Sequence, residues 1–167
     1  MVGDVETVAF LQSHALFGGI SDAGMALVVP HLREERFADG ELIVREGAPP
    51  DRMHFIVSGT AEVFVDATPE IPDDDVSASL RLLKTGDTFG EMGLIDTQPR
   101  AASVRARGPV STLSLSGPDL NRIHRGSPAV FTMIVLNLAR ELSRRLRETN
   151  RRLAATHRSA DASRYSL

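Results

Sequence analysis

The sequence predicts a mainly β domain with flanking helices, and two observations support this prediction. Short apolar segments separated by Gly, Pro and Asp recur between residues 36 and 115. Many short strands at regular spacing are typical of a sandwich or barrel rather than an α/β sheet. After Pro128 the apolar residues instead recur every three or four positions, which indicates one long helix.

The N-terminal segment predicts two short helices. An apolar face precedes Gly18-Gly19 and consists of Val8, Leu11, Leu16 and Phe17. Ser21 or Asp22 can cap a second helix, which we expect to run to about Leu32. The residues expected on its buried side are Met25, Val28, Val29 and Leu32.

The middle of the chain reads as a series of strands. The expected strands are 41–47, 54–59, 60–65, 80–83, 101–106 and 110–115. Residues 66–79 interrupt this series with an acidic, proline-bearing segment that contains Asp73-Asp74-Asp75. The cluster lacks the alternating ligand spacing and the central glycine of a calcium-binding EF-hand loop. We therefore expect a solvated hairpin tip here and no metal site.

The C-terminal helix is expected to begin at Ser127-Pro128, because proline is favoured in a first helical turn. Its apolar stripe comprises Phe131, Val135, Leu138, Leu142, Leu146, Thr149 or Asn150, and Leu153. The prediction divides the chain into helices and β domain over 1–127, this helix over 128–157, and a flexible tail over 158–167. The helix would be about 40 Å long, more than a small β domain covers. We therefore expect a parallel homodimer through 128–153, the alternative being a helix folded back on its own domain.

Length and composition restrict the class of protein. A chain of 167 residues is long enough for one domain with a sizeable core. The formal charge of −3 argues against a nucleic-acid footprint spread over the chain, and the lack of cysteine excludes disulfides and thiol nucleophiles. Acids stand near the N-terminus where a signal peptide carries bases, and no apolar run reaches the ~20 residues of a membrane span. We expect a soluble, cytoplasmic protein.

The segment 89–104 holds the residues most suited to binding a ligand. Glu91 and Arg100 stand nine positions apart, among glycine, proline and small residues. A carboxylate can accept a hydrogen bond from a sugar hydroxyl, and a guanidinium can form a forked pair with a phosphate. Gly90 permits close approach of the backbone, and a helical turn over 92–95 would direct its N-terminus at the anion. Such a loop suits a ligand with a ribose and one phosphate, whereas the alternative is a solvated Glu91–Arg100 salt bridge.

This segment closely resembles the phosphate-binding cassette of cyclic-nucleotide-binding domains. Phe89-Gly90-Glu91, Leu94 and Pro99-Arg100-Ala101-Ala102 stand in the family's order and spacing. The resemblance implies that Glu91 holds the ribose 2′-hydroxyl and that Arg100 holds the cyclic phosphate. The other loop residues implied at the ligand, largely through their backbone, are Gly90, Met92, Ala101 and Ala102.

The resemblance extends over about 16–153. Glycines 40, 47, 59 and 86 fall where the family places the turns of an eight-stranded antiparallel, jelly-roll-like β-roll, so that roll is the fold implied here. Val63 and Leu83 stand at positions that line the base and ribose pocket in the family, a role compatible with plain core packing.

The end of the long helix resembles the corresponding helix of bacterial catabolite activator proteins. Thr149-Asn150 stands where a Thr-Ser pair meets the adenine edge across the dimer in those proteins, with Asn in place of Ser. The alternative is that these two residues are only the polar end of the apolar stripe. Arg140, Arg144 and Arg147 are further candidates for stacking on the base.

The function implied is that of a regulatory sensor that binds a cyclic nucleotide and relays occupancy through its C-terminal helix to an unidentified downstream protein. Kinase regulatory subunits of the family also carry Ala at the position of Ala101, where members selective for cyclic GMP often carry Thr or Ser. We therefore expect cyclic AMP to be preferred. The alternatives are the sensor domain of a catabolite-activator-type regulator without its helix-turn-helix, and a scaffold that binds no nucleotide.

Enzyme activity is not expected. The five histidines are scattered singly, without the His-x-His set of a cupin metal site, and no Ser/His/Asp arrangement has usable spacing. No metal or cofactor is expected, and neither is a DNA-binding domain or a membrane segment within this sequence.

Overall fold

The computed structural model describes residues 5–65 and 78–164, so the expected hairpin tip lies almost entirely outside the described residues. The chain begins with helix α1 (Val5–Ser13), the 3-10 turn η1 (Ala15–Phe17), helix α2 (Asp22–Val28) and the 3-10 turn η2 (Val29–His31). Ser21 caps α2 by accepting a 3.2 Å hydrogen bond from the N–H of Gly24, as the sequence predicts. The α-helix ends at Val28 rather than near Leu32, because Pro30 lacks the backbone N–H that would continue the helical hydrogen bonds, and the 3-10 turn η2 follows.

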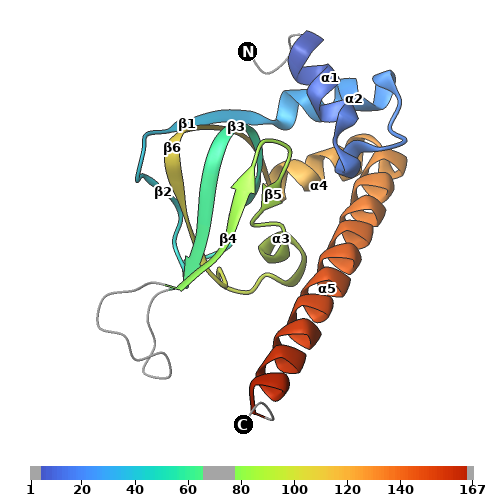
Figure 1. Ribbon diagram of the computed structural model, residues 1–167. Coiled ribbons are helices and arrows are strands. Elements are labelled where there is room, and N and C mark those ends of the chain that lie inside the picture. The colour runs from blue at the N-terminus through green and yellow to red at the C-terminus, as the bar shows by residue number, and fades with distance from the viewer. Residues whose placement is uncertain (1–4, 66–77, 165–167) are drawn as a thin grey trace.

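The β domain is antiparallel throughout its described strands, as predicted. The strands are β1 (Arg33–Phe37), β2 (Leu42–Val44), β3 (Arg52–Val65), β4 (Ala78–Lys84), β5 (Thr88–Phe89) and β6 (Ser103–Ser116). The order in the sheet is β1-β6-β3-β4, with β2 paired to β6 and β5 paired to β3. The sheet curls into a roll with the ligand-cassette segment at one side (Figure 1).

The described chain has six strands where eight were expected. The expected strands 54–59 and 60–65 are one strand, β3, and the expected strands 101–106 and 110–115 are both part of β6. Register shifts on either side of Ser58 bend β3 without breaking it. Gly59 has φ +93°, and a Cβ there would lie 2.3 Å from the Pro109 carbonyl oxygen, so only glycine fits this close crossing of the two long strands.

The remaining helices are α3 (Met92–Asp96), α4 (Gly117–Gly126) and α5 (Pro128–Arg164). Helix α3 confirms the helical turn expected over 92–95. Helix α4 was not predicted, although Ser116 caps it and Pro118 stands in its first turn. Helix α5 begins at Pro128 as predicted and continues past the expected boundary at 157, since neither glycine nor proline occurs over 129–164.

The described residues form two apolar cores. One joins the helices to the sheet and contains Leu11, Leu16, Phe17, Met25, Val28, Leu32, Met53, Phe55, Leu113, Leu115, Ile123, Ile134 and Leu138. The other fills the roll and contains Val44, Ile56, Ala61, Leu83, Phe89, Val104, Ala106 and Val110. The first core fixes the N-terminal half of α5, while the rest of α5 extends along the side of the roll (Figure 1).

A buried amide strengthens this attachment of α5. Asn137 donates hydrogen bonds to the carbonyl oxygens of Leu16 at 3.0 Å and Gly18 at 2.8 Å. Ile134 and Leu138 on the same side of the helix are buried in the core. No helix among residues 5–65 and 78–164 is both long enough and apolar enough to cross a membrane.

His54 is a buried titratable group on β3, opposite Phe89 of β5. Its ring stacks on Phe89 with centroids 4.9 Å apart, and its Nδ1 lies 3.3 Å from the hydroxyl of Thr112. Burial lowers the pKa of His54 to about 4. The nearby Glu35 carboxylate has the opposite, smaller effect, because it favours the protonated form. The folded protein therefore holds His54 neutral where the unfolded chain, with a pKa near 6.5, begins to bind a proton.

The free energy of unfolding should consequently fall as pH decreases from 6.5 toward 4, because the unfolded state gains a proton that the folded state excludes. We expect His54 to account for on the order of 2 kcal/mol of this loss. Urea unfolding at pH 7.5 and pH 4.5 measures it in the wild type and in His54→Gln. The variant should show a flatter pH dependence whatever its absolute stability, and equal slopes for the two proteins would contradict the assignment.

Candidate functional site

The segment that resembles the phosphate-binding cassette, 89–104, is called the cassette loop. It turns sharply after β5. Gly90 has φ +78°, and a Cβ there would lie 2.6 Å from Nη1 of Arg100 and 3.0 Å from the Arg52 carbonyl oxygen. Helix α3 follows and ends at Asp96. The next residue, Thr97, adopts the left-handed conformation with φ 55°. The loop thus closes around the Arg100 side chain, and glycine is required where the backbone meets the guanidinium.

Arg100 is the buried cation of this loop, with 7% of its surface exposed. Its Nη1 donates to the Gly90 carbonyl at 2.8 Å, and its Nη2 donates to the Arg52 carbonyl at 2.5 Å and to Oδ1 of Asp51 at 2.9 Å. Burial would raise the pKa of the Asp51 carboxyl, but hydrogen bonds from Arg52 and Arg100 outweigh it and hold that pKa below its ordinary value.

Glu91 is buried as well, with 4% exposed, and it does not pair with Arg100. Its Oε1 accepts a 2.6 Å hydrogen bond from Nη1 of Arg145 on α5. Its Oε2 is buried and has no hydrogen-bond partner among the described residues. A buried carboxylate oxygen without a donor is costly, so this atom is an acceptor available to a ligand hydroxyl.

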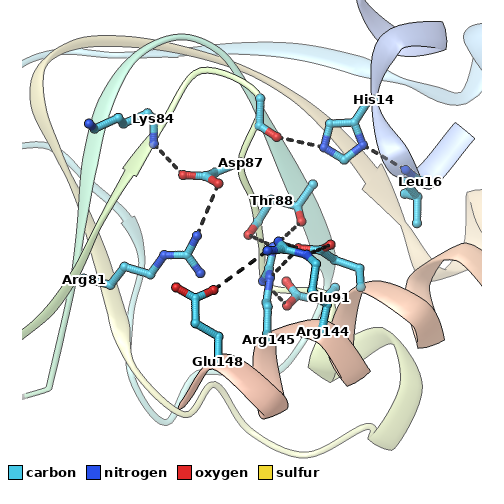
Figure 2. A network of polar contacts seen from close by, with 12 residues as sticks. His14, Leu16, Arg81, Lys84, Asp87, Thr88, Glu91, Arg144, Arg145 and Glu148 are labelled. Carbon is cyan, nitrogen blue, oxygen red and sulfur yellow. Dashed lines mark hydrogen bonds and ion pairs between the residues drawn. The ribbon is translucent and has the colours of Figure 1, made fainter. Parts of the chain in front are cut away.

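Arg145 is the functional candidate that sequence reasoning missed. Figure 2 shows it reaching from α5 between Thr88 and Glu91. Its Nη2 donates to the carbonyl of Thr88 at 3.0 Å and to its hydroxyl at 2.7 Å, and its Nε donates to Glu141 at 2.9 Å. The sequence signal was the i,i+4 spacing of Glu141 and Arg145, which is equally common on a solvated helix face.

Glu141 lies at the centre of the charges on this part of α5. It accepts hydrogen bonds from Arg144 as well as from Arg145. These bonds, of which the one from Arg144 has the largest effect, lower the pKa of Glu141 to about 2, although burial opposes the shift. Glu141 is therefore ionised at every pH at which the protein would be studied, and it holds Arg145 in position toward the cassette.

Arg100, Glu91 and Arg145 line a cavity of about 590 Å³ between the roll and α5. The predicted site residues that line it are Val63, Leu83, Gly90, Glu91, Met92, Arg100, Ala101, Ala102 and Thr149. The wall also includes the apolar side chains of Val44, Leu80 and Val104, together with Arg81 and Glu148. The cavity therefore has apolar walls, a buried cation and a buried acid, which suits an amphipathic anion of nucleotide size.

Some predicted base-contacting residues lie elsewhere. Asn150 is exposed and does not line the cavity, because successive residues of an α-helix are turned about 100° apart and Thr149 and Glu148 take the inward positions.

The three arginines proposed as alternatives also lie outside the cavity wall. Arg140 donates to Asn137 at 2.9 Å, Arg144 donates to Glu141 at 2.6 Å, and Arg147 donates to Ser143 at 2.9 Å. The positively charged contact between α5 and the cassette is made instead by Arg145.

No group of three or more His, Cys, Asp or Glu side chains is placed to hold a metal ion among the residues that the structure describes. The chemistry that the described cavity offers is recognition, through a guanidinium, a carboxylate and backbone groups held in fixed positions.

Comparison with known proteins assigns the fold and the cassette to one family. Residues 34–127 match the family model of the cyclic nucleotide-binding domain. A cAMP-dependent protein kinase regulatory subunit of Emericella nidulans is 34% identical over 115 residues, which are 69% of this chain and 26% of that protein. A cyclic nucleotide-gated potassium channel of Mesorhizobium japonicum is 36% identical over 115 residues, which are 69% of this chain and 29% of the channel.

Solved structures of other proteins have a similar fold. The Thermus thermophilus catabolite activator protein superposes with a TM-score of 0.71 at 27% identity, covering 86% of this chain and 63% of that one. The regulatory domain of Toxoplasma gondii PKA, crystallised with cAMP, gives 0.65 at 28% identity, covering 80% and 48%. The chain spans only about a quarter of the length of the kinase regulatory subunits it matches. With more than half of its residues inside the family model and the cassette built around Glu91 and Arg100, the chain belongs to the cyclic nucleotide-binding domain family.

Proposed function

We propose that this protein is a cytoplasmic regulatory sensor, without enzyme activity of its own, that binds cyclic AMP in preference to cyclic GMP. One observation carries the proposal. Arg100 and Glu91 are both buried at the same cavity, and Glu91 keeps one carboxylate oxygen without a hydrogen-bond partner among the described residues. A ligand with a phosphate and a neighbouring sugar hydroxyl satisfies both groups at once.

The residues take the following roles in this proposal. Arg100 pairs with the cyclic phosphate, and Oε2 of Glu91 accepts a hydrogen bond from the ribose 2′-hydroxyl. Backbone groups of Gly90, Met92, Ala101 and Ala102 complete the phosphate cradle. Val63 and Leu83 provide the apolar wall, and Thr149 lies at the edge where a base would meet α5.

The preference for cyclic AMP rests on Ala101. This residue lines the cavity directly after Arg100 and offers the ligand no side-chain donor or acceptor. A guanine exocyclic amine placed against it would lose its hydrogen bonds to water without replacement. The Toxoplasma gondii relative, crystallised with cAMP, supports the same ligand class.

The relay to α5 would pass through Arg145. Arg145 and the ribose share the Glu91 carboxylate, Arg145 at Oε1 and the ribose at Oε2. Occupancy therefore changes the contact between cassette and helix. A ligand shifts the helix only by its different affinity for the two arrangements. The Asn137 hydrogen bonds to Leu16 and Gly18 hold the first part of α5, so the change acts on the part beyond them.

A homodimer through α5 is part of the proposal. The apolar stripe expected from the sequence divides in two, because Leu138 is buried against the helix's own domain. Val135 and Leu146 remain 40% and 62% exposed. With Ala139, Thr149 and Leu142, which is half-buried against the helix's own core, they follow the alternating spacing of three and four that forms a coiled-coil seam.

Calorimetric titration tests the binding itself. We expect cyclic AMP to bind roughly tenfold more tightly than cyclic GMP, because of the unsatisfied guanine amine. Arg100→Ala should weaken cyclic AMP binding by roughly 10- to 100-fold, the usual effect of losing a charge-assisted hydrogen bond. Arg36→Ala, which removes an exposed arginine from β1, is the matched control and should bind normally. Absence of binding by the wild type would favour a non-binding scaffold, and tighter cyclic GMP binding would reverse the assigned preference.

Hydrogen exchange tests the relay. Cyclic AMP should slow amide exchange in α5 around Arg145, since the ligand adds contacts at Glu91 and Thr149. Arg145→Ala should lose most of this effect. Among the described residues Arg147 donates only to Ser143 on the same helix, so Arg147→Ala should retain it. An exchange pattern in α5 that is the same with and without ligand would refute the relay.

Sedimentation tests the dimer. At concentrations on the order of tens of micromolar the wild type should sediment as a dimer, and Leu146→Glu should shift it toward monomer by placing a charge in the apolar seam. Leu27→Glu makes the same change at an exposed leucine on α2 and should leave the dimer intact. A monomeric wild type, both with and without ligand, would contradict this part of the proposal.

A further inference from the structure

The cations that line the cavity are already paired with acids. Among the described lining residues, Arg81 contacts Asp87 at 3.2 Å, Arg100 contacts Asp51 at 2.9 Å, and Arg145 contacts Glu91 at 2.6 Å. Each guanidinium charge is therefore compensated before any ligand arrives. An entering anion meets donors in good geometry but little net positive charge.

Asp51 is the acid that contacts Arg100, the guanidinium expected to bind the phosphate, although Asp51 itself does not line the cavity. It precedes β3, and its two carboxylate oxygens lie 2.9 Å from Nη2 of Arg100 and 2.8 Å from Nε of Arg52. Its side chain is 61% exposed, so it needs no rearrangement of the core to persist beside a ligand. The hydrogen bonds from Arg52 and Arg100 keep the pKa of Asp51 low, so the carboxylate is charged at neutral pH.

The charges behind Asp51 do not change this balance. Arg52 also contacts Glu35 at 3.0 Å, so Glu35, Arg52, Asp51 and Arg100 form a chain of alternating sign. His54 lies 3.6 Å from Glu35 and is neutral at pH 7, since its pKa is about 4. Arg52, the second guanidinium of this series, is thus already paired with two acids and cannot bind a second phosphate charge.

Resting on the proposed function, we propose that Asp51 is a specificity-determining residue that selects singly charged phosphate esters and rejects doubly charged ones. A phosphate that pairs with Arg100 lies close to the Asp51 carboxylate, because both groups share one guanidinium. A cyclic phosphodiester brings one negative charge to this position. A phosphomonoester brings nearly two at neutral pH, since its second pKa is about 6. The second charge finds no unpaired guanidinium among the described lining residues and is repelled by Asp51.

Two linear nucleotides of nearly the same shape isolate the effect of charge. Adenosine 5′-monophosphate is close to doubly charged at pH 7.5, whereas adenosine 5′-sulfate carries one charge. Displacement of a fluorescent cyclic AMP analogue measures both affinities. We expect the wild type to bind the sulfate about tenfold more tightly than the phosphate, as the repulsion of one extra charge a few ångströms from a half-exposed carboxylate requires.

The variant Asp51→Asn keeps one oxygen that can accept from Arg100. It removes the charge together with the second acceptor oxygen, which bonds Nε of Arg52. It should bring the two affinities to within about threefold of each other, mainly by tightening the monophosphate. Asp96→Asn removes one charge from a cavity-lining residue that makes no contact with Arg100 among the described residues, and it should keep the wild-type ratio.

Failure of the inference is distinguishable from failure of the proposed function. If the cyclic AMP analogue does not bind the wild type, the proposed function is wrong. If the analogue binds, but the wild type treats sulfate and monophosphate alike, Asp51 is not a charge filter. The same conclusion follows if Asp51→Asn leaves their ratio unchanged, or if neither linear nucleotide displaces the analogue from that variant. The wild-type ratio needs no variant, so the test stands even if Asp51→Asn folds poorly.

Discussion

The buried guanidinium of Arg100 is the constraint on which the site depends. A guanidinium removed from water must have its N–H groups bonded, and here the partners are the carbonyls of Gly90 and Arg52 and the carboxylate of Asp51. Those three partners come from the loop and from the start of β3. Satisfying one side chain therefore sets the path of the cassette, requires glycine at position 90 and fixes the loop against the sheet.

An ion pair between the buried Glu91 and the half-buried Arg145 connects that cassette to α5. Glu91 and Arg145 lie on elements far apart in the sequence, and their contact is reinforced by Thr88 on β5 and Glu141 on the helix. The pair leaves one oxygen of Glu91 without a partner among the described residues. Breaking a largely buried pair of this kind is strongly unfavourable unless another group takes its place. The same carboxylate is therefore both the anchor of the helix and the part of the cavity most in need of a ligand.

The sequence was sufficient for the fold class, the cassette and the start of the long helix, because each has a local signature: turn residues, the Phe89–Ala102 spacing and Pro128. It was insufficient where partners are distant. Two expected strand pairs merge because β3 and β6 bend at bulges, which a glycine such as Gly59 marks only ambiguously. Arg145 looks like any solvated arginine until the fold places Thr88 and Glu91 beside it, and Asp51 has no motif at all.

The unbroken length of α5 has a mechanical consequence. The helix is held by the core and by Asn137, and it continues without interruption to Arg164. Once the Arg145–Glu91 contact is rearranged, as the proposed relay requires, about 27 residues or roughly 40 Å of helix extend beyond the fulcrum at Asn137. A tilt of about 10° at that fulcrum would displace the far end by roughly 7 Å at this length. Under the proposed relay, a small rearrangement of one carboxylate contact near the fulcrum would thus produce a larger displacement at the far end of the helix.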